Sequence, residues 1–286
     1  MKILSDILLI IGVKKNKISL VRKSLEHGAD VNWWKRFGIN ILYPVIKNGN
    51  ERLLELLIKY GVDLKWHEHE KDKIAPLAYA CRCGNAPMIK MFVDTGYNLN
   101  CKEANDICQE LAARDRFYTL KYLLEHGLNI NIPVCEERTG LHWAVQEGYM
   151  RIVKLLVENG ADVNVLDDYD SPLRLACGDG KFEMAKYLLE NHALVDLAVD
   201  DTPLIIASCV GYMEIIKLLL KYGADINWKD KDGRSALFFA KAHRQKEVVQ
   251  FLIENGADTE LVDKFGISIQ DLDKKSMRKK AIWDLN

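Results

Sequence analysis

The amino-acid sequence predicts an all-α solenoid made of helix–turn–helix units with projecting β-turn fingers. The first observation is a repeated phrase: LLVENGADVN, which ends at Asn164, has close copies that end at Asn32, Asn227 and Glu260. The second is that the glycine of this phrase recurs at a nearly constant spacing. The third is that a full unit contains two short stretches with the apolar periodicity of an amphipathic helix.

A glycine, or a residue in the equivalent place, marks the end of each unit. Successive members of this series lie 31 to 35 residues apart. The series is Gly28, Gly61, Gly96, Gly127, Gly160, His192, Gly223 and Gly256. A constant period of this length indicates a repeat array, because no unit can bury its apolar face alone and stacked units bury a shared one.

A helix cap opens each unit. The cap reads TGLH from Thr139, SPLR from Ser171, TPLI from Thr202, SALF from Ser235 and APLA from Ala75. A Thr or Ser side chain can accept a backbone N–H at a helix start. Proline in the next place costs little, because the first helical N–H has no partner anyway. We therefore expect the first helix of each unit to begin at this cap.

A turn and a second helix follow the first helix. The turn is marked by Gly148, Gly180 and Gly211. The next stretch, such as RIVKLLVENG, has its apolar residues at amphipathic spacing, as in Ile152, Val153, Leu155 and Leu156. The glycine of the series then ends this helix, because a left-handed residue is least strained without a Cβ. The residues ADVN are expected to extend into a projecting finger.

This grammar of a β-turn and two antiparallel helices in 33 residues resembles the ankyrin repeat. The resemblance covers nearly the whole chain and is most specific over residues 139–164 and 202–227. It implies one solenoid over residues 1–286, with about eight repeats and a C-terminal capping unit. The expected parts are an N-terminal cap unit (1–36), repeats (37–265) and a C-terminal cap (266–286). The basic residues that suit a solvated capping helix are Lys274, Lys275, Arg278, Lys279 and Lys280.

Two departures from the pattern are expected to soften or bend the array. The fourth unit, residues 102–131, lacks the Thr-Pro-Leu-His cap and has Asp115 where a turn glycine is usual. His192 takes a place of the glycine series, where a non-glycine residue costs about 1 kcal/mol or more.

The charge balance and the N-terminus exclude several classes of protein. The 286 residues carry 40 basic and 41 acidic side chains, a balance that argues against a nucleic-acid or membrane partner. The segment MKILSDILLIIGVKKNK is interpreted as the first helix and not as a signal peptide, because Asp6 interrupts it and no small-residue cleavage site follows. Residues 7–13 are too few to span a bilayer. Cys81 and Cys177 are expected to be buried small hydrophobes of a reducing compartment, so we expect a cytoplasmic protein, or one delivered from there into a host cell.

Motifs for catalysis or for metal binding are not recognisable. The sequence has no Gly-rich phosphate loop, nucleophile elbow or paired histidine ligands, so we expect no enzyme and no cofactor. The pair Cys81 and Cys83 lacks a second pair at zinc spacing. HEHE, residues 67–70, could bind a divalent metal, but without a third ligand a solvated finger is favoured. His142, in the cap motif, is implied by the resemblance to support backbone hydrogen bonds.

Some aromatic residues exceed what the repeat requires. Trp33, Trp66 and Trp228 each lie five residues after their glycine. Other units place an apolar residue there, so this row is either an aromatic binding ladder or a half-buried row of stacked fingers. Trp34 and Phe37 stand where other units have polar residues. The sequence WWKRF therefore forms either an exposed aromatic and basic tip or a segment packed on the first helix pair.

Acidic residues crowd two adjacent fingers. They are Asp167, Asp168, Asp170, Asp200 and Asp201. Stacked fingers lie about 10 Å apart, so the fields of these residues add. Like charges held together cost stability unless something compensates for them, and a basic segment of a partner would do so.

These observations predict a protein-binding module without chemistry of its own, as the resemblance to ankyrin repeats implies. The binding face is expected to combine finger tips with the inner surface of each first helix. The alternative is a microbial or viral effector, immunity or inhibitor protein that occludes a foreign target protein. In either case we expect a monomer. The candidate contacts are Trp34, Arg36, Phe37, Trp66, Trp143, Asp168, Tyr169, Asp170 and Asp201.

Overall fold

The computed structural model describes residues 2–38, 40–65, 75–100, 104–131, 138–168 and 170–273. The chain divides into two compact units, residues 1–133 and 134–286, and each is described by itself. The expectation of one solenoid over residues 1–286 therefore stays a prediction. The all-α repeat architecture is confirmed: each unit is built from consecutive pairs of helices, and the one β-bridge among the described residues joins Val262 and Ser268.

The helices of unit 1 form four pairs. They are α1 (Lys2–Lys14), α2 (Ile18–Glu26), α3 (Leu42–Lys47), α4 (Glu51–Lys59), α5 (Pro76–Cys83), α6 (Ala86–Asp94), α7 (Ala104–Ala112) and α8 (Phe117–Glu125), with a 3₁₀ turn η1 (Trp33–Phe37) after α2. The helices of unit 2 also form four pairs. They are α9 (Gly140–Glu147), α10 (Met150–Glu158), α11 (Pro172–Gly178), α12 (Phe182–Glu190), α13 (Pro203–Val210), α14 (Met213–Lys221), α15 (Ala236–Ala242) and α16 (Lys246–Glu254), followed by η2 (Gln270–Asp273).

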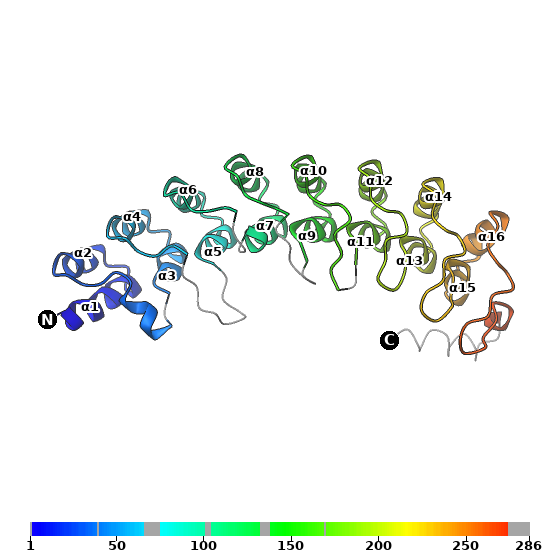
Figure 1. Cartoon of the computed structure of the whole chain (residues 1–286), viewed down its shortest axis with the longest axis horizontal. Helices are drawn as coiled ribbons and strands as arrows, with labels where there is room; N and C mark the ends of the chain where they lie inside the picture. Colours follow the sequence, from blue (N-terminus) through cyan, green and yellow to red (C-terminus); the bar gives the residue numbers. More distant parts are fainter. Residues whose placement is uncertain are drawn as a thin grey trace. The chain divides into compact units, whose positions relative to one another are not determined.

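Within each unit the first helices of the pairs lie in one row and the second helices lie in a row beside it (Figure 1). First helices pack on the next first helix, as α11 does on α13 and α13 on α15. The described loops that follow the second helices project past the first-helix row, and we call the side to which they project the finger side (Figure 1).

The predicted caps start the first helices. Thr202 Oγ1 accepts the backbone N–H of Ile205 at 3.3 Å, and Ser171 Oγ accepts that of Arg174 at 3.2 Å. Thr139 forms a capping box with His142, whose Nδ1 accepts the Thr139 N–H at 3.1 Å. The expected role of His142 in backbone hydrogen bonding is thus confirmed.

The predicted left-handed positions are confirmed. Every glycine of the series has a positive φ, and so do the substituted positions His192 (φ 69°) and Asp115 (φ 51°). At the turn glycine Gly180 (φ 71°) a Cβ would lie 2.7 Å from the Tyr212 ring of the next helix pair. Glycine is required there by the backbone conformation and by the close approach of the next pair.

The repeated phrase ties each helix pair to the next one through its asparagine. Asn164 Nδ2 donates to the His192 carbonyl at 3.1 Å, while its Oδ1 accepts the Leu194 N–H at 2.8 Å. Asn32 and Asn227 make the same two bonds one period further along the chain. The aspartate of the phrase shapes the finger base, because Asp162 Oδ1 accepts the Asn164 N–H at 2.8 Å.

The core lies between the two rows of helices. All four predicted apolar residues of α10, Ile152, Val153, Leu155 and Leu156, are buried. Cys81 and Cys177 are also buried, as expected, and burial raises the pKa of both thiols.

A buried arginine anchors the C-terminal end of unit 2. The Arg234 side chain is fully buried between the rings of Phe238 and Phe265, whose centroids lie 5.5 and 5.4 Å from its Cζ. Its Nε donates to the carboxylate of Asp263 at 3.2 Å. The predicted C-terminal cap begins with buried Ile267 and Ile269, whereas its predicted basic helix at 274–286 lies outside the described residues.

Candidate functional site

The finger of the first helix pair is folded by Trp34. Trp34 was expected to be exposed, and this expectation is wrong: its exposed fraction is 0%, and its Nε1 donates to the Val31 carbonyl. The finger closes as the short 3₁₀ turn η1, which turns this position inward, whereas equivalent positions in other units carry polar residues. Trp34 is therefore part of the structural base of the finger and is withdrawn from the candidate contacts.

Phe37 and Arg36 remain exposed at the tip of this finger. The Phe37 side chain is 56% exposed and packs on Trp33, with ring centroids 4.6 Å apart at 58°. Gly38 then leaves the turn in the left-handed conformation (φ 62°). Lys35 forms an ion pair with Asp63 of the following finger, which fixes the side of the turn. The tip thus presents an aromatic pair and a guanidinium on a braced loop.

The acidic cluster of unit 2 is neutralised within the chain. Asp167 is buried, accepts the Asp170 N–H at 2.6 Å and accepts from Arg138 Nε at 2.9 Å. Asp170 is also buried and forms an ion pair with Arg174. Hence the expectation that a partner must compensate for these charges is wrong for Asp167 and Asp170. The exposed contact expected at Asp170 is withdrawn, because its carboxylate is already bound.

Two other aspartates of the cluster are accessible. Asp168 is exposed, and Asp201 is half-buried beside Arg174. Arg174 Nε donates to the Asp201 carbonyl at 2.9 Å, and its Nη2 lies 3.9 Å from the carboxylate. Burial raises the pKa of Asp201 more than this arginine lowers it. Asp200 is exposed and pairs with Lys231 at 3.1 Å, so this finger also carries a cation.

Trp143 lies on α9 on the finger side of unit 2. Its side chain is half-buried, and the Arg138 guanidinium lies 5.6 Å from the ring centroid. The same arginine binds Asp167, so it joins the aromatic surface to the finger. Below it, His142 Nε2 lies 3.2 Å from the Asp170 carbonyl, and burial lowers the pKa of this imidazole.

Sequence reasoning missed Arg138, Arg174 and Trp33 as organising residues. A signal for Arg174 existed: it takes the place of His142 in the cap, and both reach a carbonyl of the following finger. The signal for Arg138 was weaker, since it only precedes Thr139. Of the row that contains Trp33, the described members Trp33, Val165, Leu197 and Trp228 are half-buried.

Several predicted positions lie outside the described residues. They are Trp66, Tyr169 and the segment His67–Glu70. Within the described ranges no group of three or more His, Cys, Asp or Glu side chains could hold a metal ion. The described helices also include none that is long and apolar enough to cross a bilayer.

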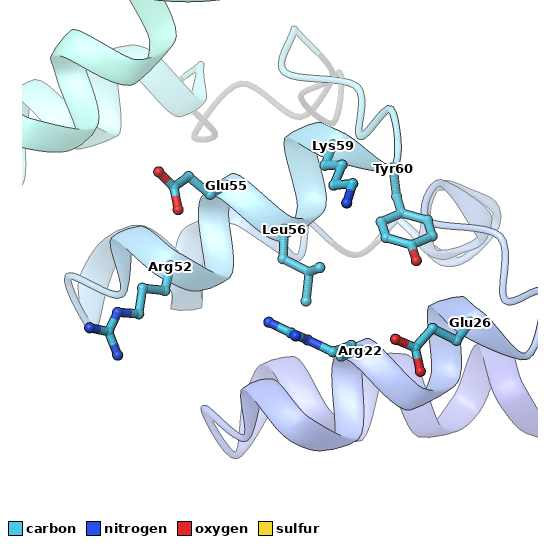
Figure 2. Close-up of a pocket in the computed structure, with 7 residues that line it drawn as sticks. All are labelled: Arg22, Glu26, Arg52, Glu55, Leu56, Lys59 and Tyr60. Carbon is cyan, nitrogen blue, oxygen red and sulfur yellow. The ribbon is translucent and has the colours of Figure 1, made fainter.

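A polar groove lies on the other side of unit 1, between the second helices α2 and α4 (Figure 2). Its volume is about 420 Å³, and its walls are Arg22, Glu26, Arg52, Glu55, Leu56, Lys59 and Tyr60. One period separates Arg22 from Glu55 and Glu26 from Lys59, so opposite charges stand at equivalent places of the two helices. This alternation is typical of a solvated surface, and we assign no ligand to the groove.

Comparison with known proteins agrees with the repeat architecture. A family described as ankyrin repeats (3 copies) matches residues 9–103, 105–167 and 173–263. Ankyrin repeat protein FPV115 of fowlpox virus is 27% identical over 248 residues, which cover 75% of this chain and 44% of that protein. Ankyrin repeat protein L371 of Acanthamoeba polyphaga mimivirus is 22% identical over 239 residues, covering 81% and 27%.

A channel protein is also similar over much of this chain. The human transient receptor potential cation channel subfamily A member 1 is 27% identical over 250 residues, covering 81% of this chain and 22% of the channel. The chain spans less than half the length of these relatives.

Proposed function

Because the chain belongs to the ankyrin repeat family, whose repeats are generally non-catalytic protein–protein interaction modules, we propose that it binds a partner protein through its finger side and has no catalysis of its own. The partner is a folded or extended protein segment, and no cofactor takes part. The near-neutral charge, −1 at pH 7, supports a protein partner over nucleic acid, which needs a basic surface. We further propose that the chain acts as a monomer in the cytoplasm.

The aromatic tip of the first finger carries this proposal. Phe37 is more than half exposed, yet it is held by Trp33 and by a turn whose base is the buried Trp34. A rigid aromatic side chain loses little conformational entropy on binding, which is a property of interface hot spots. The adjacent Arg36 adds a guanidinium that can pair with a carboxylate of the partner.

Unit 2 would contribute a second patch on its own finger side. Its members are Trp143, the exposed Asp168 and the partly exposed Asp201. The half-buried tryptophan supplies apolar area, and the aspartates suit a basic residue of the partner. Because the neighbouring arginines already hold Asp167 and Asp170, this patch contributes fewer free charges than the sequence implied.

A second candidate function is an effector or inhibitor that occludes a foreign target protein. Two of the relatives above are viral proteins, and this supports the alternative. The physical contact would be the same, because occlusion also requires a preformed protein-binding surface. The two functions differ in the source of the target, so capture from the producing organism and from its host distinguishes them.

The test is a binding measurement with the captured partner. Phe37→Ala should weaken binding by about 2 kcal/mol, mainly through a faster off-rate. Tyr118→Ala is the matched control, because Tyr118 is a strongly exposed aromatic residue on α8 of the same unit. Asp168→Lys should instead slow association, and salt should weaken wild-type binding. If Phe37→Ala and Asp168→Lys bind like the wild type, the finger side is not the binding surface.

A further inference from the structure

The first helix of unit 1 exposes an apolar stripe. Ile3, Ile7 and Ile11 follow one another at a spacing of four residues and so lie on one face of α1. They are 67%, 42% and 37% exposed, and Leu4, on the same face, is 61% exposed. The opposite face of α1 is occupied, because Leu9 and Val13 are buried against the unit. We call the four exposed residues the α1 stripe.

This stripe departs from what a terminal repeat needs. A terminal repeat is expected to have a polar outer face, because nothing stacks on it. Elsewhere in unit 1 the first helices bury their apolar residues by packing on one another, α3 on α5 and α5 on α7. The α1 stripe is a surface of the same kind, since α1 packs on α3 and stands at the end of that row (Figure 1). Its shape therefore suits another helix laid along it.

The charges around the stripe have one sign. Lys2, Lys14, Lys15 and Lys17 are all exposed at the two ends of the helix. The acidic residue of α1, Asp6, is buried, and its carboxylate accepts the backbone N–H of Asp30 at 2.7 Å. An apolar surface with a basic rim is complementary to an apolar surface with an acidic rim.

We propose that the α1 stripe docks an amphipathic helix of a partner protein, with an apolar face and acidic flanks. The helical shape follows from the stacking of first helices, and the acidic flanks follow from the lysine rim. A second copy of the chain fits less well, because antiparallel pairing of two α1 helices would bring Lys2 of one copy near Lys14 of the other. This surface is separate from the finger side and does not depend on the function proposed there.

The test uses designed helical peptides and the full chain. The first peptide has an aliphatic stripe with glutamate flanks, the second has the same stripe with lysine flanks, and the third has the composition of the first in scrambled order. Fluorescence anisotropy measures the affinity of each. The glutamate-flanked peptide should bind about tenfold tighter than the lysine-flanked one, the preference should shrink as salt rises, and the scrambled peptide should not bind.

Variants then assign the binding to the stripe. Ile3→Gln, Ile7→Gln and Ile11→Gln combined should abolish binding, whereas Ile253→Gln should not, although Ile253 has the same 42% exposure as Ile7. Phe37→Ala should leave peptide binding unchanged, which separates this surface from the finger side. If the triple variant unfolds, Lys14→Glu with Lys15→Glu should reverse the preference to the lysine-flanked peptide.

Three results would overturn the proposal. The first is equal affinity for the three peptides. The second is concentration-dependent dimerisation in sedimentation that the triple variant removes, which would assign the stripe to a second copy. The third is stripe-dependent binding to phosphatidylserine vesicles without binding to any peptide, which would assign it to a lipid surface.

Discussion

Asp196 stands where three other fingers have the bridging asparagine, and it cannot make both bonds of that bridge. Its Oδ2 accepts the Asp225 N–H at 2.9 Å, as the asparagine oxygen does. Its Oδ1 takes the place of the amide nitrogen, which in Asn164 donates to the carbonyl of His192. A carboxylate oxygen cannot donate, and this atom is buried without a hydrogen-bond partner among the described residues. Burial raises the pKa of Asp196.

Asp196→Asn should therefore stabilise the protein. The new bond from the amide to the Gly223 carbonyl is worth about 0.5–1.5 kcal/mol, and removal of an unsatisfied buried acceptor is worth about 1–3 kcal/mol. The side chain is only half-buried, so water relieves part of that second cost. We expect the free energy of unfolding to rise by about 1–2 kcal/mol at pH 7.

The gain should depend on pH in a defined direction. Because the pKa of Asp196 is higher in the folded than in the unfolded chain, the protonated carboxyl favours folding. That contribution is fully present below the unfolded pKa of about 4 and is lost as the pH rises through the folded pKa. A protonated carboxyl can also donate to a carbonyl, as an amide does. The advantage of the Asp196→Asn variant should thus be largest near neutral pH and shrink on acidification.

Urea unfolding followed by circular dichroism at several pH values measures this difference. Asn164→Asp is the reciprocal control and should destabilise the protein by a similar amount at pH 7, again less at low pH. A variant at Asp196 that is no more stable than the wild type, or whose gain is independent of pH, would show that the bridge does not act as described.

Two other predictions concern the ends of the stability range within each unit. Asp263→Ala should lower the free energy of unfolding by about 3–5 kcal/mol in urea titrations, because it leaves the buried Arg234 guanidinium without its carboxylate; Lys264→Ala, at a largely exposed neighbouring cation, should change it much less. In hydrogen exchange, amides of α7 should be less protected than those of α13, because the fourth unit lacks the Thr-Pro cap and has a strained Asp115 at its turn; equal protection of the two helices would contradict this.

The helices were predictable from the sequence because the repeat states each of their local requirements. A cap at Thr202, a left-handed residue at Gly180 and the apolar spacing of α10 depend on backbone conformation and on neighbours one period away. The same rule located His192 as a left-handed non-glycine residue, although its sequence offered no glycine.

The candidate surface was less predictable because exposure depends on contacts outside that grammar. Trp34 was expected at a tip, but the first finger closes as a 3₁₀ turn and rotates it into the core. Asp170 was expected to be free, but Arg174 replaces the cap histidine of its own helix and binds it. Position in the repeat cannot predict either event, since each depends on a residue type found in one unit only.

The asparagine bridge also determines how such an array can change length during evolution. Its donors and acceptors recur with the period of the sequence, so Asn164 reaches the His192 carbonyl just as Asn227 reaches that of Gly256. Deletion of residues 165–196 would join Asn164 to Leu197 and offer it the Gly223 carbonyl and the Asp225 N–H in the same register. Recombination by whole periods thus restores every bond at the junction. Gain or loss of any other number of residues leaves a donor and an acceptor of the bridge unmatched.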